Sequence, residues 1–185
     1  LLQVDANTAY TRKDFDLLKR LDEFNLLLIE QPINEEDMLG HAKLADYIET
    51  PVCLDETIIS ADIARDAIEL GAAEIININP SRVGGYLESV KIHDIAVANN
   101  IPVWCGGMLE TGIGRAANLA LAAMPGFTLP GDTSASSRYF ETDLTEPFVL
   151  VDGHISVPTG PGIGVDPIPE IIERFAVSRE WIKRP

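Results

Sequence analysis

The stretches LLQVD (residues 1–5), LLLIE (26–30) and PVCLD (51–55) decide the fold that we expect for this chain. Each is an apolar run that ends in a carboxylate, and the acids Asp5, Glu30 and Asp55 follow one another at intervals of 25 residues. Parallel strands that are buried on both faces read as continuous apolar runs, and the residues between these runs read as helices. The repeat therefore predicts alternating parallel strands and helices, with the three acids at equivalent strand ends.

The period continues through three further apolar runs, so that about six β/α units are visible. These runs are AEIININ (73–79), IPVWCGG (101–107) and GFTLPGD (126–132). Helices are expected between them: one capped by Ser60 and stopped by Gly71, one from about Tyr86 to Asn99, and one after Gly114.

The repeat ends after the sixth unit. FVLVDGHISV (148–157) predicts a β-hairpin that turns at Asp152-Gly153, and residues 169–181 predict a closing helix. A closed barrel of β/α units ordinarily has eight strands and about 250 residues. We therefore expect an α/β fold in which residues 1–185 form one domain, the C-terminal portion of a (β/α) barrel. Its first two strands and any capping domain would precede Leu1.

Composition and charge exclude several classes of function. The net charge is −15 with only 14 basic residues, which argues against nucleic-acid binding. No apolar stretch approaches the roughly 20 residues of a membrane span, and we expect no secretory signal. Cys53 and Cys105 lie in separate runs without a CxxC motif, which favours a reducing cytoplasm.

Three carboxylates at one barrel mouth predict a cation site. At about 4 Å and an effective dielectric constant near 20, each pair of like charges repels by roughly 4 kcal/mol. Carboxylate oxygens suit Mg²⁺ better than zinc, which favours nitrogen and sulfur ligands. The alternative is that the acids only cap the helices that follow them.

Six motifs, in this order and at this spacing, resemble the C-terminal barrel of the enolase superfamily, muconate-lactonizing subgroup. The likeness is greatest to the o-succinylbenzoate synthase and N-acylamino acid racemase (N-succinylamino acid racemase) families, and it covers essentially the whole chain. The motifs are VDANTAY (4–10), IEQP (29–32), LDET (54–57), NPSRVGGYLES (79–89), WCGGMLETGIGRAA (104–117) and LPGDTSAS (129–136).

The resemblance implies the chemistry of the site. Asp5, Glu30 and Asp55 would bind Mg²⁺, with Mn²⁺ as a second possible ion. The ion would stabilise an enediolate formed when a proton is removed from the carbon beside a carboxylate. The product would be that of a dehydrating lyase or of a racemase. We expect a small-molecule carboxylate as substrate, a homo-oligomeric protein, and no nucleic-acid or membrane partner.

The two lysines that transfer protons in this subgroup are not found in the chain. One belongs to a KxK motif on the second barrel strand, which would lie before Leu1. The other matches Asn79, within NINP where relatives read NIKP. An amide has no protonation equilibrium near neutral pH and cannot act as a general base.

Three accounts of Asn79 remain open: a natural variant without racemisation, an engineered replacement, or a one-base reaction that uses the missing strand. The alternative function is a catalytically inactive fragment or pseudoenzyme that keeps the metal site.

Further site residues follow from the resemblance by position. Gly106, Gly107 and Met108 would approach the side chain of the substrate, although Met108 could equally be core. Glu110 would bond the sixth-strand lysine, for which water or the amide of Asn79 would substitute.

The resemblance also implies residues around these. Asn7 and Glu56 would orient the metal ligands. Asp132 is a candidate on the substrate side, although turn chemistry explains it equally well. Ser134 breaks the DxD pattern of the dipeptide epimerases and disfavours that activity. The three histidines, His41, His93 and His154, end no barrel strand, so no catalytic role is expected for them.

Overall fold

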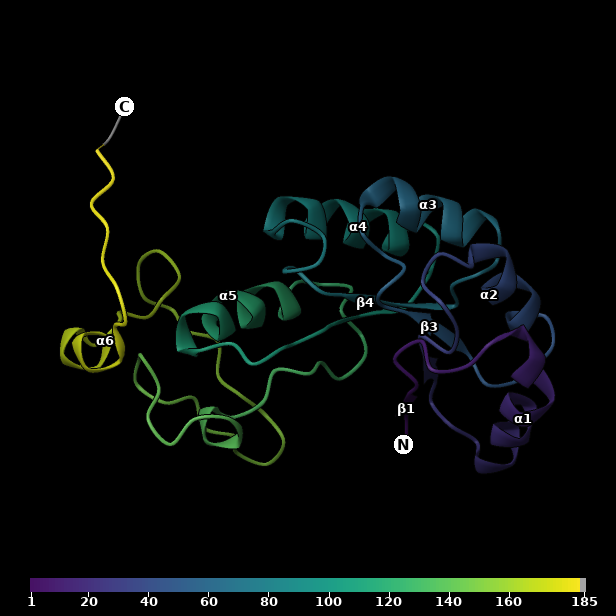
Figure 1. Ribbon diagram of the computed structural model, residues 1–185, viewed down its shortest axis with the longest axis horizontal. Coiled ribbons are helices and arrows are strands. Elements are labelled where there is room, and N and C mark those ends of the chain that lie inside the picture. The colour runs from purple at the N-terminus through teal and green to yellow at the C-terminus, as the bar shows by residue number, and fades with distance from the viewer. Residues whose placement is uncertain (184–185) are drawn as a thin grey trace. The chain divides into compact units, whose positions relative to one another are not determined.

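The computed structural model describes residues 1–183. Within this range, five strands form one parallel sheet in the order in which they occur in the sequence (Figure 1). The strands are β1 (Val4–Asp5), β2 (Ile29–Glu30), β3 (Val52–Leu54), β4 (Ile75–Ile78) and β5 (Val103–Cys105). Pairing between consecutive strands, each linked by a helical crossover, confirms the predicted parallel α/β fold.

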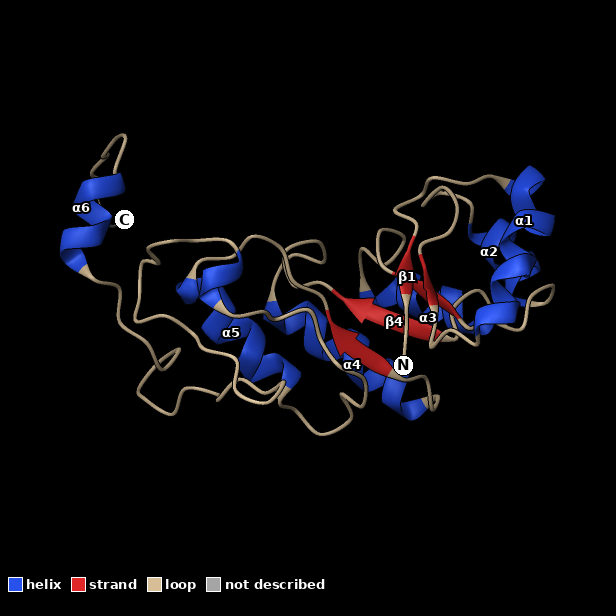
Figure 2. Ribbon diagram, turned by 90° about the horizontal axis from the view of Figure 1, so that it is seen from below, coloured by secondary structure: helices blue, strands red, loops and turns tan. Residues whose placement is uncertain are grey.

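Helices α2, α3 and α4 lie on one face of this sheet (Figures 1 and 2). Apolar residues on the helix-facing side of the strands, such as Ile29, Leu54 and Ile76, are buried in the main hydrophobic core. The helices and 3-10 turns are η1 (Arg12–Asp14), α1 (Phe15–Lys19), η2 (Arg20–Phe24), α2 (Met38–Ala45), α3 (Ala61–Glu69), α4 (Tyr86–Ala98), α5 (Gly112–Ala122), η3 (Ser136–Arg138) and α6 (Pro169–Phe175). No helix within residues 1–183 is long and apolar enough to cross a membrane.

Local sequence explains both ends of α3. The hydroxyl of Ser60 accepts the N–H of Ile63 at 3.3 Å and caps α3, and Gly71 takes the left-handed conformation just after that helix, as predicted. Helix α5 begins at Gly112, earlier than the expected start after Gly114. The reason is remote in sequence: the carboxylate of Asp143 accepts the N–H of Gly112 at 2.7 Å.

The C-terminal predictions are correct in part. Asp152 and Gly153 both have positive φ, as a two-residue hairpin turn requires, and Val151 pairs with His154 in an antiparallel bridge. The sixth apolar run makes a single parallel bridge, between Phe127 and Val103, and no full strand. Helix α6 ends at Phe175 and does not reach Trp181, because it buries no residue that could stabilise a longer helix.

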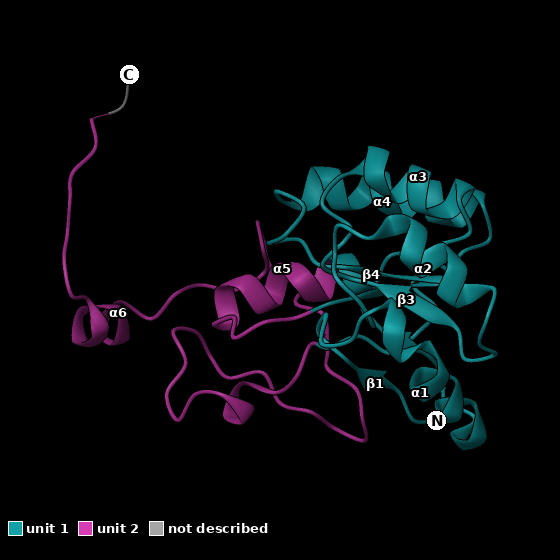
Figure 3. Cartoon of the chain, turned by 45° about the vertical axis from the view of Figure 1, so that its right-hand side comes forward, with its two compact units in different colours: residues 1–106, 121–132 teal, residues 107–120, 133–185 magenta. Residues whose placement is uncertain are grey.

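The chain divides into two compact units, which Figure 3 distinguishes by colour. The first comprises residues 1–106 and 121–132 and contains the whole sheet. The second comprises residues 107–120 and 133–185. Within the second unit, the buried Asp143 carboxylate also accepts the hydroxyl of Ser136 at 2.6 Å, and the buried Arg115 donates to the carbonyl of Glu110 at 2.8 Å.

Candidate active site

The pairing of the strands places the predicted acids on one face of the sheet. Asp5 pairs with Glu30, and Glu30 pairs with Cys53. Side chains of paired residues point to the same face, and residues two apart on a strand share that face. Asp55, two residues after Cys53, therefore continues the same row, on the face opposite the helices. This arrangement requires only the register of three adjacent strands.

Glu30 is the most strongly perturbed acid of this row. Its side chain is 4% exposed, and its Oε1 accepts the side-chain amide of Asn77 at 2.7 Å. Burial raises the pKa of Glu30 to about 8, the Asn77 hydrogen bond opposes this rise, and the negative charges of Asp5, Asp55 and Glu56 add to it. The Glu30 carboxylate therefore lies within electrostatic reach of three other acids.

Asp55 is the second buried acid. Its carboxylate accepts both Nε (3.1 Å) and Nη2 (2.8 Å) of Arg82, which follows β4. Burial raises the pKa of Asp55 to about 6, although the bonds and charge of Arg82 oppose the rise, and Glu56 and Asp5 contribute to it. Arg82 is thus the cation that the structure places against Asp55, and a metal ion bound there would share this carboxylate with it.

Asp5 is exposed and accepts the backbone N–H of Asn7 at 2.9 Å. The amide of Asn7 in turn donates to Oε1 of Glu56 at 3.3 Å, while Oε2 of Glu56 is buried and has no hydrogen-bond partner among residues 1–183. Asn7 and Glu56, both predicted to orient ligands, therefore link the segment after β1 to the segment after β3.

The donor set fits a hard divalent cation. The groups on this face are carboxylate oxygens, several are buried, and one buried oxygen lacks a partner. As placed in the described part of the chain, however, no three His, Cys, Asp or Glu side chains stand close enough together to hold a metal ion. The proposed ligands thus share a face and interact electrostatically, and their role as ligands stays a prediction.

Asn79 lies just beyond the end of β4 and is 3% exposed. Its Oδ1 accepts the N–H of Ser81 at 3.2 Å and the hydroxyl of Ser81 at 2.7 Å. This is a local turn in which the side chain replaces a backbone acceptor. The residue at the position of the expected lysine therefore has a structural role in the strand-to-helix turn.

Asp132 lies near two of the acids of this row. A cavity of about 410 Å³ is lined by side chains from β1, β2 and β5 and from the last apolar run. Asp132 donates its backbone N–H to the carbonyl of Cys105 at 3.0 Å, which ties that run to the end of β5. The cavity residues are Leu1, Gln3, Asp5, Leu27, Glu30, Trp104, Pro130, Gly131 and Asp132.

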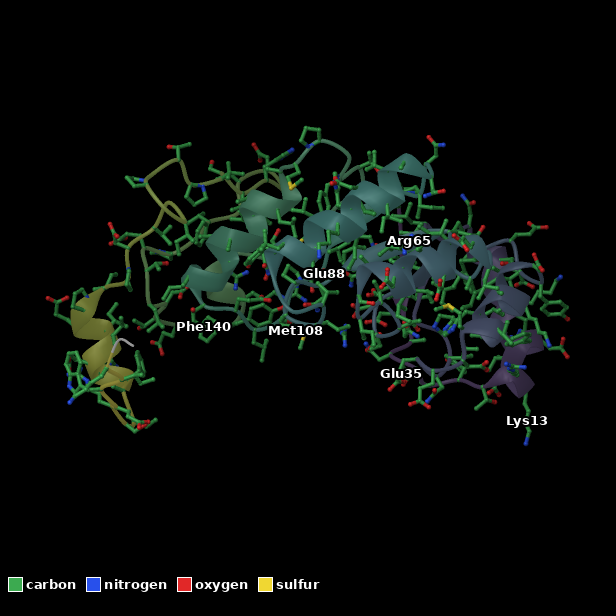
Figure 4. All side chains as sticks on the ribbon, turned by 90° about the horizontal axis from the view of Figure 1, so that it is seen from above. Lys13, Glu35, Arg65, Glu88, Met108 and Phe140 are labelled. Atoms are coloured by element: carbon green, nitrogen blue, oxygen red, sulfur yellow. The ribbon has the colours of Figure 1, made fainter. Side chains whose placement is uncertain are left out.

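The remaining predicted residues follow β5. Gly106 is buried, and its N–H donates to the carbonyl of Ile78 at 3.0 Å. Gly107 begins the second unit. There Met108, labelled in Figure 4, is exposed, so the core alternative for this residue is wrong. The carboxylate of Glu110 accepts the N–H of Met108 at 2.8 Å and the amide of Asn118 at 3.2 Å.

None of the three histidines ends a strand of the sheet, as predicted. His41 lies in α2, His93 in α4 and His154 in the hairpin. Burial lowers the pKa of His41, and its Nε2 lies 3.3 Å from the side-chain nitrogen of Gln31.

Three residues that contact the acidic row, which is Asp5, Glu30 and Asp55, were not predicted from the sequence. Asn77 bonds Glu30, Arg82 bonds Asp55, and the side-chain oxygen of Gln31 accepts the backbone N–H of Asp55 at 3.0 Å. The sequence did indicate Asn77, because it lies two residues before Asn79, and side chains two apart along an extended segment share a face. No sequence pattern indicated Arg82, because an irregular turn places it.

Comparisons with known proteins agree on one family. Residues 1–171 match the family model described as "Enolase C-terminal domain-like". An N-succinylamino acid racemase from Amycolatopsis sp is 65% identical over 182 residues, which are 98% of this chain and 50% of the relative. An o-succinylbenzoate synthase from Bacillus subtilis (strain 168) is 49% identical over 180 residues, 97% of this chain and 48% of the relative.

The fold has close counterparts among solved structures. A crystal structure of an enolase superfamily member from Listeria innocua matches with a TM-score of 0.91 at 45% identity, covering 94% of this chain and 47% of that one. The chain therefore spans about half the length of the curated relatives that it matches.

Proposed function

The chain belongs to the enolase C-terminal domain-like family of the enolase superfamily, and from this premise we propose that it carries the metal-binding part of an enzyme that removes a proton beside a carboxylate. The relatives named above are a racemase and a synthase, an isomerase and a lyase. The proposed substrate is a small carboxylate of the kind these names imply: an N-succinylamino acid or the precursor of o-succinylbenzoate.

The row of acids on one sheet face carries this proposal. Burial raises the pKa of Glu30 and the negative charges of Asp5, Asp55 and Glu56 raise it further, and a divalent cation would offset the repulsion among these acids. Asp5, Glu30 and Asp55 would hold Mg²⁺ or Mn²⁺, and Asn7 and Glu56 would orient these ligands. When bound, the ion supplies positive charge to the carboxylate oxygens on which negative charge develops.

The other predicted residues would bind and orient the substrate. Asp132 lines the cavity that also contains Asp5 and Glu30, which supports a place on the substrate side. Gly106, Gly107 and Met108 would contact the substrate's side chain, and Glu110 would take the role of the acid that the resemblance assigns to it. We also propose that residues 1–185 form one barrel domain of a longer, homo-oligomeric parent protein, in which preceding strands supply a lysine.

A specific observation favours the second candidate, a metal-binding protein without proton transfer. Asn79 stands where the family resemblance predicts the sixth-strand lysine, and its side chain accepts hydrogen bonds from Ser81. An amide cannot take up the substrate proton. A racemase needs a base on each face of the substrate, whereas an elimination from one face could proceed with the other lysine alone.

Hydrogen exchange in deuterated solvent tests the proposal. The α-proton of an N-succinylamino acid is followed by NMR with Mg²⁺ and the chain, its Asn79→Lys variant, or the parent protein. We expect exchange with Asn79→Lys and in the parent, and little with the unchanged chain. Lack of exchange in all three would leave the metal-binding protein as the function.

Calorimetric titration with Mg²⁺ tests the ligands separately. The unchanged chain should bind the ion and Asp55→Ala should not. If the folded chain binds no Mg²⁺, the proposed metal site is wrong.

A further inference from the structure

Asn77 is a buried amide whose role the proposed reaction does not explain. It lies on β4, is 4% exposed, and its Nδ2 donates to Oε1 of Glu30 at 2.7 Å. Glu30 binds a cation as the ionised carboxylate, which only accepts hydrogen bonds, and in the structure the amide nitrogen is the end of the Asn77 side chain that faces it. The bond engages one oxygen of Glu30, and the other oxygen takes no part in it.

The opposite end of the same amide is not satisfied. Oδ1 of Asn77 is buried and has no hydrogen-bond partner among the described residues. An unpartnered buried oxygen destabilises a folded protein, and an apolar side chain of similar size would avoid this cost. Stability alone therefore does not account for an asparagine here, whereas a donor aimed at Glu30 does.

Gly106 provides the space that this amide occupies. A Cβ at position 106 would meet Oδ1 of Asn77 first and would also lie 2.8 Å from its Nδ2 and 2.9 Å from its Cγ, all closer than a Cβ approaches a nonbonded atom. The backbone of Gly106 is held by its N–H bond to the carbonyl of Ile78 at 3.0 Å. Any side chain at position 106 would therefore displace the Asn77 amide from Glu30.

We propose that Asn77 is a positioning residue that holds the Glu30 carboxylate toward Asp5 and Asp55 for metal binding, and that Gly106 keeps Asn77 in place. This inference rests on the proposed metal site. It gives Gly106 a role toward the metal ligand in addition to its expected contact with substrate.

The test measures Mg²⁺ binding by calorimetry, without substrate, and stability by urea unfolding. Asn77→Leu should weaken Mg²⁺ binding at least about tenfold, as losses of groups that orient metal ligands do. Gly106→Ala should weaken binding in the unchanged background and have no further effect on Asn77→Ala, because alanine at position 77 leaves room for the new methyl group. This non-additivity is specific to the proposed contact.

Thr50→Val is the matched control. Thr50 is also buried and donates to a carboxylate, that of Asp22, at 2.8 Å, but it precedes β3 and lies at the opposite strand end from Asp55. This variant should lose stability and keep its Mg²⁺ affinity.

Two results would overturn the inference and are distinguishable. If the unchanged chain binds Mg²⁺ and both Asn77→Leu and Gly106→Ala bind it equally well, the positioning role is wrong while the metal site stands. If the unchanged, folded chain binds no Mg²⁺, the metal site and the inference fail together. Gly106→Ala, which keeps the amide, decides the question should Asn77→Leu not fold.

Discussion

The side chain of Asn79 illustrates a conflict between local structure and chemistry. Its Oδ1 accepts two bonds from Ser81, which a lysine cannot replace. We therefore predict that Asn79→Lys lowers the free energy of unfolding by about 1 kcal/mol, the usual contribution of such bonds, even if the new lysine restores proton exchange. Urea unfolding followed by circular dichroism measures this, with Asn79→Ala as the control that loses the same acceptor. Equal midpoints for all three proteins would show that the turn does not depend on Asn79.

The thiol of Cys53 gives a second prediction for a single residue. Burial raises the pKa of this thiol well above its ordinary value, and the charge of Glu30 raises it further. Since the thiolate is the reactive form, Cys53 should not react with Ellman's reagent at pH 8 in the native chain, but should react in urea. The absorbance of the released thiolate counts the reacting groups. A fast native reaction that Cys53→Ala abolishes would contradict the burial of this residue.

The period in the sequence predicted where three acids would lie. The register brings Asp5, Glu30 and Asp55 to one face of the sheet because equivalent strand ends recur, and their role as metal ligands stays a prediction. Arg82 could not be found, because its guanidinium reaches Asp55 from a turn that has no periodicity. Among residues 1–183, no three acidic side chains stand close enough together to hold a metal ion. The sequence could not predict this, because the distances between carboxylates depend on side-chain rotamers.

At the scale of elements, the carboxylate of Asp22 connects η2 to the segment that enters β3. It accepts the N–H groups of Glu49 (3.1 Å) and Thr50 (2.9 Å) and the hydroxyl of Thr50 (2.8 Å). Burial acts to raise the pKa of Asp22, but these bonds outweigh it and the pKa is lowered. A lowered pKa in the folded state means that the carboxylate stabilises the fold above its unfolded pKa of about 3.9, and that this contribution is lost as the pH falls through the folded value.

We therefore predict that Asp22→Ala lowers the free energy of unfolding by roughly 2 kcal/mol at pH 7, the range for hydrogen bonds to a charged group. The difference in the free energy of unfolding between Asp22→Ala and the unchanged chain should become smaller toward pH 2.5. Urea unfolding at both pH values checks this. A gap of the same size at pH 2.5 would mean that the charge of Asp22 is not what stabilises the connection.

Helix boundaries were predicted correctly only where neighbouring residues determine them. Helix α3 was predicted correctly because its cap, Ser60, and its stop, Gly71, are adjacent to it. The predicted start of α5 was wrong because the acid that caps this helix, Asp143, lies 31 residues further along the chain. The predicted end of α6 was wrong because an amphipathic pattern alone does not stabilise a helix that buries no residue.

For the whole molecule, the net charge of −15 opposes the compact state through self-repulsion. Added NaCl screens this repulsion, with a Debye length of about 10 Å at 0.1 M, and should raise the melting temperature gradually. Mg²⁺ should do more than screen. At a hundredfold excess over its dissociation constant, an ion that binds only the folded state adds about 2.7 kcal/mol of stability.

The two effects separate at matched ionic strength. We predict a higher melting temperature in MgCl₂ than in NaCl for the unchanged chain, measured by calorimetry, because only Mg²⁺ can bind the acidic row. Asp55→Ala should lose this difference and keep the response to NaCl, since one charge in fifteen hardly alters the self-repulsion. Equal melting temperatures in the two salts would mean that Asp5, Glu30 and Asp55 contribute to the overall negative charge but bind no specific ion. A difference that survives in Asp55→Ala would place the bound ion elsewhere on the acidic surface.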